Sequence, residues 1–287
     1  MNNTIDLSQL PAPEVIESLD FEVVLDELKS DLIDRMPPDD RDAISDTLDM
    51  ESEPLTKLLE VVAYREIILR QRVNESARAV MLAFASGSDL DQIGANYNVV
   101  RLKGESDTDF RSRVQMSFES YSTAGSRGSY AFHGRSADPD VKDIQITSPS
   151  EGEVDVYVLS RAGNGYPSAS LVGTVTDALS ADTVRPLTDK VTVHPAEIVT
   201  YTVEATLFVL PGPDQESIRD SAAEALQKMT DEKHRIGARV SLAAIYSALY
   251  RNGVEYVELS TPTEDIVATG TQAPFCNGFD IDTQEAA

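Results

Sequence analysis

Three histidines and one cysteine are the side chains of this sequence best suited to catalysis or transition-metal binding. His133 is expected in a Gly- and Ser-bordered loop, His194 on a strand and His234 in a charged turn, and none has a second ligand at zinc-site spacing. Cys276 is the only cysteine, which excludes an intramolecular disulfide and a thiolate-rich metal site. Its neighbours 273–275 predict a buried or half-buried terminal turn.

Acidic pairs and a glycine-rich segment are the other chemical candidates. Asp39-Asp40 and Asp89/Asp91 lack the spaced ligands and terminal Glu of a calcium-binding loop, so solvation and helix capping explain them better. Gly163-Asn164-Gly165 is not followed by Lys and Ser or Thr, which favours a turn over a phosphate-binding loop. We therefore expect no catalytic residue, no metal, no cofactor and no enzymatic activity.

The charge balance restricts the partners. The 287 residues include 49 Asp and Glu against 24 Lys and Arg, a formal net charge of −25, which opposes direct nucleic-acid binding. The first sixty residues alone carry seventeen acidic and four basic side chains. Such a run can steer a basic partner, but it is more typical of a solvated face that keeps the segment soluble. No stretch approaches eighteen apolar residues and no leader-like segment begins the chain. We expect synthesis in the cytoplasm and no membrane insertion.

The first fifty residues predict an extended arm followed by one amphipathic helix. Apolar side chains recur at helical spacing until Met36-Pro37-Pro38 ends the pattern. Such a narrow stripe on a short helix is typical of a segment that joins a partner's helices. The alternative is packing on the chain's own downstream helices. The predicted partner-interface residues are Phe21, Val24, Leu25, Leu28 and Leu32.

Further helices are predicted up to about residue 122. One long helix starts near Pro54 and runs to about Ala85, and another covers Asp107–Tyr121 with Phe110, Val114 and Phe118 on one side. Between them, Asp89 can cap a short turn and Gly94 is expected to adopt a conformation that larger residues resist. The apolar stripe of the long helix consists of Leu55, Leu58, Leu59, Val62, Leu69, Val73, Val80, Met81 and Phe84.

From about residue 140 the hydrophobic period changes to two. Strands around 144–146 and 154–158, a helix with Leu171, Val175 and Leu179, and a strand at 191–193 make one unit. A long strand over 199–209 opens a second unit. Two helices and a strand at 254–259 follow it, the first helix bearing Ile218, Ala222, Leu226 and Met229, the second Leu242, Ile245, Tyr246 and Leu249.

The predicted fold class is α+β, in four parts. Residues 1–50 form the N-terminal arm and partner-binding helix, and residues 51–122 form a helical domain. Residues 123–198 and 199–287 form two small, loosely similar α+β domains. Modular units without an active site are typical of an assembly subunit with several partners.

Six segments, in order along nearly the whole chain, resemble the baseplate assembly protein J family of contractile-tailed bacteriophages. Any one of them is a common kind of turn, but six in the family's order are hard to reach by chance. The strongly acidic balance departs from the family pattern and concerns only surface electrostatics. The segments are Thr4–Pro13, the corner Gly87–Arg101, Gly104–Asp107, Ser122–Gly125, Val184–Asp189 and Gly212–Asp214.

The resemblance implies a structural subunit of the baseplate wedge, located in the virion. Members of this family join a companion wedge protein through N-terminal helices and neighbouring wedges through C-terminal domains, in the ring around the central hub. It implies no enzymatic activity and no cofactor. One alternative is a tail-associated hydrolase of cell wall or polysaccharide, although a chain without tryptophan is poorly suited to stack on sugar rings. A cytosolic assembly chaperone, absent from the finished particle, is a third hypothesis.

Overall fold

The computed structural model describes residues 5–11, 13–122, 125–212 and 214–286. Its contacts divide these into two compact units that meet in sequence at Val100 and Arg101. The fold class is α+β, with helices first and small mixed sheets after them, as predicted. The residues Thr4, Ala12, Thr123, Ala124 and Pro213, which belong to segments carrying the family resemblance, lie outside the described residues.

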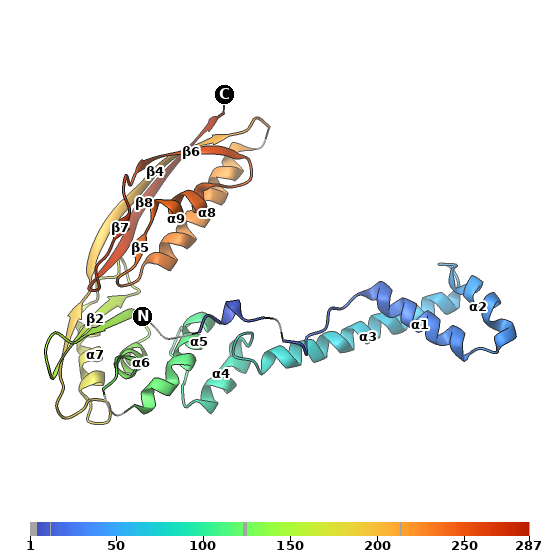
Figure 1. Ribbon diagram of the computed structural model, residues 1–287, viewed down its shortest axis with the longest axis horizontal. Coiled ribbons are helices and arrows are strands. Elements are labelled where there is room, and N and C mark those ends of the chain that lie inside the picture. Colours follow the sequence, from blue (N-terminus) through green and yellow to red (C-terminus); the bar gives the residue numbers. More distant parts are fainter. Residues whose placement is uncertain (1–4, 12, 123–124, 213, 287) are drawn as a thin grey trace. The chain divides into compact units, whose positions relative to one another are not determined.

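The first unit is helical. Its elements are the short 3-10 helices η1 (Leu7–Gln9) and η2 (Pro38–Asp40) and the α-helices α1 (Phe21–Arg35), α2 (Arg41–Leu48), α3 (Pro54–Ala79) and α4 (Gly87–Asn96). Asp20 caps α1 by accepting hydrogen bonds from the backbone N–H groups of Glu22 and Val23. Helix α1 runs antiparallel beside α3, with α2 between them in sequence (Figure 1). The predicted helices of this region are therefore present.

Several details of the first unit differ from the predictions. Helix α2 was not predicted, and helix α4 occupies the segment predicted as a short turn, with Ser86 and not Asp89 at its N-cap. Helix α3 ends at Ala79 and not near Ala85, because the N–H of Met81 bonds to the carbonyl of Arg78 and tightens the last turn. Gly94 is buried inside α4 with ordinary helical geometry. The left-handed conformations of this segment fall instead on Gly87 and Asn98, whose φ angles are 51° and 57°.

The second unit begins with α5 (Asp107–Met116), the 3-10 helix η3 (Ser117–Tyr121) and α6 (Arg127–Ala137). The predicted helix over Asp107–Tyr121 thus changes type after Met116. Phe110 and Val114 are buried, but the tighter 3-10 turn rotates Phe118 off that face and leaves it exposed. His133 lies on α6 and not in the predicted loop. Two glycines weaken the helical pattern of this segment: Gly128 lies against the side chain of Glu119, and Gly134 lies against that of Ile144.

The first sheet has the order β1-β2-β3, from β1 (Val141–Thr147), β2 (Glu153–Ser160) and β3 (Lys190–Pro195). Strands β1 and β2 are antiparallel, with Ile144 opposite Val158, whereas β2 and β3 are parallel and joined through α7 (Ala169–Ser180). Helices α6 and α7 pack on this sheet. The predicted order of strand, strand, helix and strand is confirmed.

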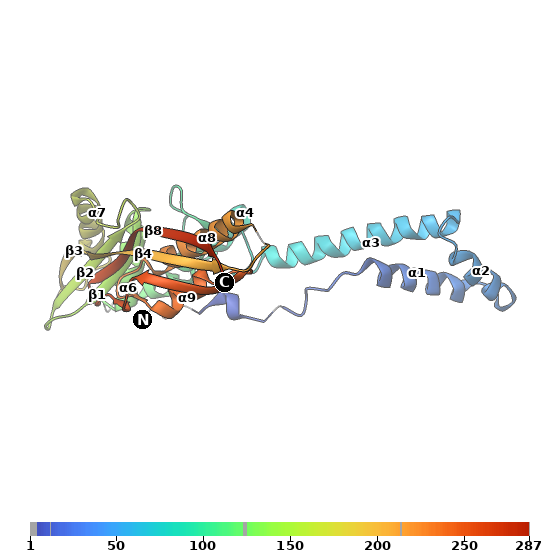
Figure 2. The same cartoon turned by 90° about the horizontal axis from the view of Figure 1, so that it is seen from above.

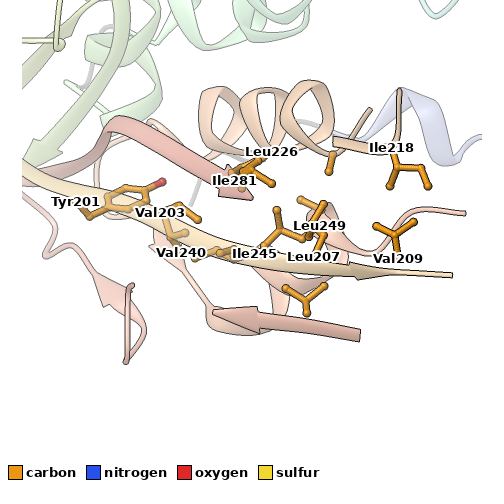
Figure 3. Close-up of a cluster of buried hydrophobic side chains, with 14 residues drawn as sticks. Tyr201, Val203, Leu207, Val209, Ile218, Leu226, Val240, Ile245, Leu249 and Ile281 are labelled. Carbon is orange, nitrogen blue, oxygen red and sulfur yellow. The ribbon is translucent and has the colours of Figure 1, made fainter. Parts of the chain in front are cut away.

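The second sheet has the order β6-β4-β8, from β4 (Glu197–Val209), β6 (Val254–Thr261) and β8 (Gln272–Glu285). Helices α8 (Gln215–Lys233) and α9 (Leu242–Leu249) cover one face, and β5 (Arg239–Val240) pairs with β7 (Ile266–Val267) beside them. Figures 1 and 2 show this layer of sheet and helices. Alternate residues of β4, the predicted ones from Tyr201 to Val209, enter a core with Ile218, Leu226, Ile245 and Leu249 (Figure 3).

Strand β8 was not predicted. Cys276 lies within it, half-buried, and not in a terminal turn. The register of β8 against β4 shifts between Tyr201 and Val203, so its side chains do not keep one alternating phase along the strand.

Two segments that carry the family resemblance meet in the second unit. Gly125 has a φ of 68°, and a Cβ there would lie 2.7 Å from the side chains of both Pro186 and Asp189. Asp189 also accepts a 2.8 Å hydrogen bond from the buried Tyr130 hydroxyl. Burial and this hydrogen bond raise the pKa of Tyr130. These segments therefore have a structural role.

Candidate partner-binding surface

The potential catalytic side chains lie on separate elements. His133 is on α6, His194 on β3 and His234 at the end of α8, and Nε2 of His194 lies 3.2 Å from Oδ1 of Asp155. Burial raises the pKa of the Cys276 thiol, which disfavours the reactive thiolate. No group of three or more His, Cys, Asp or Glu side chains is suited to hold a metal ion in the described part of the chain.

His234 has a structural position. It is 7% exposed, and its Nδ1 lies 3.0 Å from Nζ of Lys142 on β1, which joins the end of α8 to the first sheet. Burial and the adjacent ammonium group lower the pKa of His234 to about 4. Beside it, the N–H of Ile236 donates to a carboxylate oxygen of Asp143, also on β1. These contacts hold the two α+β parts of the second unit together.

The predicted partner-interface residues pack within the chain. Val24 and Leu25 are buried against Ala63 of α3, and Phe21 and Leu28 are partly buried in the same cluster. Leu32 is also partly buried. The structure thus shows the alternative arrangement, in which the stripe packs on a downstream helix, and contact of these residues with a partner stays a prediction.

Polar contacts fix the hairpin of α1 and α3. Asn74 is buried, and its side-chain amide exchanges hydrogen bonds with the backbone N–H and carbonyl of Glu17, just before α1. Arg70 pairs with Glu66 on its own helix and lies 3.9 Å from carboxylates of Glu17 and Glu27. The side of α3 that faces α1 is therefore lined by small, polar and paired side chains as well as apolar ones.

The opposite side of α3 is apolar and exposed. Leu69 is 67% exposed and Val80, just past the helix end, 75%. No described element of the first unit covers these side chains. Exposed apolar side chains that form one continuous patch along a helix usually mark an interaction site. We call this the outer face of α3, and it comprises Leu58, Val61, Val62, Tyr64, Ile68, Leu69, Val73 and Val80.

Sequence reasoning found only part of the outer face. The predicted stripe includes Leu58, Val62, Leu69, Val73 and Val80 but treats them as an ordinary amphipathic face. Val61, Tyr64 and Ile68 were missed. The signal that could have found them is the second row that Val61 and Ile68 form, seven residues apart, which makes the helix apolar on more than one side.

Comparison with known proteins gives the family. Residues 51–105 match the baseplate J-like N-terminal domain, and residues 122–195 match the baseplate J-like central domain. The chain is 51% identical over 294 residues to baseplate protein J of Escherichia phage P2, with 97% of each sequence covered. The chain belongs to the baseplate J family. It is accordingly a structural protein of a phage tail baseplate.

A solved baseplate structure shows a more distant similarity. A chain of the anti-feeding prophage baseplate, solved as a 6-fold symmetrised particle, is 16% identical, with a TM-score of 0.40 over 51% of this chain and 36% of that chain. The N-terminal family model spans α3 and α4, so the outer face lies in a region shared across the baseplate J family. None of the described helices is long and apolar enough to cross a membrane.

Proposed function

We propose that this baseplate J family member is a wedge subunit of a contractile tail, which joins a companion wedge protein through its helical unit. The observation that carries this proposal is the outer face of α3. Its residues Leu58, Val62, Leu69, Val73 and Val80 are separated by four, seven, four and seven positions, a spacing that keeps them on one stripe.

The energetics favour a helical partner. Helix α3 has 26 residues and is therefore about 39 Å long, enough for several layers of interhelical packing. Full burial of one leucine or valine side chain contributes roughly 1.5 to 3 kcal/mol by area. The summed burial free energy of several such residues exceeds the free-energy cost of ordering a partner helix. The outer face can therefore decide whether a wedge forms.

Helix α1 supports this surface from behind. Val24 and Leu25 hold α1 on α3, while the partly buried Phe21, Leu28 and Leu32 keep apolar area that a partner can still cover. In this proposal the predicted partner-interface residues act with the outer face of α3 and not alone.

The C-terminal part provides contacts between wedges. Within the described residues, β6 and β8 each pair only with β4, so both edges of this sheet present unpaired backbone groups. Open edges can pair with a neighbouring chain. We assign the ring contacts to residues 199–287, and we retain the division into residues 1–50, 51–122, 123–198 and 199–287, with assembly in the host cytoplasm.

The test is a triple variant of the outer face, Leu58→Ser with Leu69→Ser and Val73→Ser, in a tagged chain that complements a phage without its own copy. We expect the variant to lose its companion wedge protein on affinity purification while both units melt as in the unchanged chain. Leu187→Ser is the matched control, because Leu187 is 96% exposed in the second unit. Normal wedges from the triple variant would show that the contact lies elsewhere.

A further inference from the structure

Helix α3 carries more basic than acidic side chains, although the protein as a whole is acidic. Arg65, Arg72 and Arg78 are exposed, and none of them forms an ion pair with another described residue. The half-buried acids of this helix, Glu60 and Glu66, are paired with basic residues of the same helix. The exposed acid, Glu75, lies seven residues after Ile68 and accepts a hydrogen bond from Gln71. Helix α3 therefore carries five basic and three acidic side chains. The whole chain carries a net charge of −25, so this local sign reversal requires an explanation.

The arginines lie within the apolar surface. Arg65 and Arg72 are seven residues apart, so they align along the helix about 10 Å from each other. At 100° per residue, both fall between the row of Val62 and Leu69 and the row of Val61 and Ile68. A partner helix that covers these rows must therefore meet both guanidinium groups.

Burying an arginine side chain that has no carboxylate to pair with is unfavourable, because the guanidinium group loses its hydration. A carboxylate on the partner replaces the lost water, because it accepts two parallel hydrogen bonds from the guanidinium group. Arginine forms this two-bond pair better than lysine does. The chemistry of the surface thus specifies acidic residues beside the apolar stripe of whatever binds there.

We infer that the occupant is an amphipathic helix of the companion wedge protein whose Asp or Glu side chains pair with Arg65 and Arg72. This inference rests on the proposed function of the outer face. It adds that the partner helix is acidic. Pairing between its carboxylates and the two arginines would set the register of the helices and accelerate their encounter.

A second copy of this chain fits the surface less well. Its helix α1 exposes Glu22, Asp26, Glu27, Asp31 and Asp34, but the apolar stripe of α1 is already packed on its own α3. Its α3 would set arginines against arginines. We therefore assign the occupant to another protein.

The test uses the full chain and two synthetic amphipathic helical peptides. They share a leucine stripe and differ only in the flanking positions, which are Glu in one and Lys in the other. By fluorescence anisotropy at low salt, we expect the Glu peptide to bind about 10-fold more tightly, and the difference to shrink at high salt. Arg65→Glu with Arg72→Glu should reverse the preference. Lys228→Glu, an exposed cation of α8, is the matched control and should change nothing.

The outcomes separate this inference from the proposed function. If both peptides bind equally and the arginine variant has no effect, the inference is overturned while the outer face remains a docking surface. If the unchanged chain binds neither peptide, both fail. Self-association of the unchanged chain that Arg65→Glu with Arg72→Glu abolishes would make a second copy the occupant and overturn the inference.

Discussion

Replacing Val24 and Leu25 with serine should release α1 from α3. Both side chains are buried against Ala63, and removal of a buried leucine costs about 2 to 5 kcal/mol, with a smaller cost for valine. The pair therefore contributes roughly 4 to 6 kcal/mol to the hairpin. Helix α1 has 15 residues, and a helix of that length is marginal in water without tertiary packing.

Hydrogen exchange measured by mass spectrometry tests this directly. Loss of about 4 kcal/mol corresponds to a roughly 1000-fold loss of protection, which we expect in peptides from residues 21–35. Peptides from β4 should keep their protection, because they belong to the other unit.

The control is Val23→Ser, since Val23 is the exposed neighbour of the buried pair. It should leave protection of α1 unchanged. The reasoning is refuted if the Val24 and Leu25 variant keeps the protection of α1, or if the Val23 variant loses as much.

Two further predictions concern the second unit, and a third concerns the whole chain. Lowering the pH from 7 to 5 should reduce its free energy of unfolding by about 2 kcal/mol in denaturant titrations, because His234 has a pKa of about 4 when folded against 6.5 when unfolded. This stability is complete above pH 6.5 and is lost as the pH falls toward 4, and His234→Gln should remove that part of the pH dependence. Deletion of residues 199–287 should leave wedges that electron microscopy never shows closed into rings. The purified chain should not clear bacterial cell walls in a turbidity assay, and lysis would instead support the hydrolase alternative.

The elements predicted well are those in which one face is buried and its apolar residues recur with a regular period. Strand β4 alternates strictly from Tyr201 to Val209 because one face packs on α8 and α9. Helix α7 presents Leu171, Val175 and Leu179 to its sheet, and all three are buried. In such elements, local pattern and tertiary packing agree.

Other elements were missed because packing requires residues that weaken the local pattern. In α6, Gly134 lowers helix propensity, yet a Cβ there would lie 2.3 Å from Cδ1 of Ile144 on β1, so a larger residue would force the Ile144 side chain to move. In β8, Pro274 and Gly278 interrupt a strand pattern whose register already shifts. Neither packing constraint is visible from the segment alone.

The candidate partner-binding surface was also only partly predictable from the sequence. An apolar stripe on a helix indicates that something covers it, but it does not identify what. Pattern reasoning assigned partner contact to Phe21, Leu25 and Leu28, which pack on α3 in this structure. The side of α3 that receives α1 includes Thr56, Ala63 and Asn74, a set with little hydrophobic signal. The stronger stripe of α3 lies exposed on the opposite side.

The most direct test of the proposed docking surface is the accessibility of residue 69 before and after assembly. In a chain with Cys276→Ser, a Leu69→Cys thiol can be labelled with a maleimide in the free protein and in purified tails, with denatured tails as the reference for full reactivity. The exposed position of Leu69 predicts rapid labelling in the free chain. Burial by a partner helix predicts labelling at least about 10-fold slower in tails. Equal rates in the free chain and in tails would contradict the account.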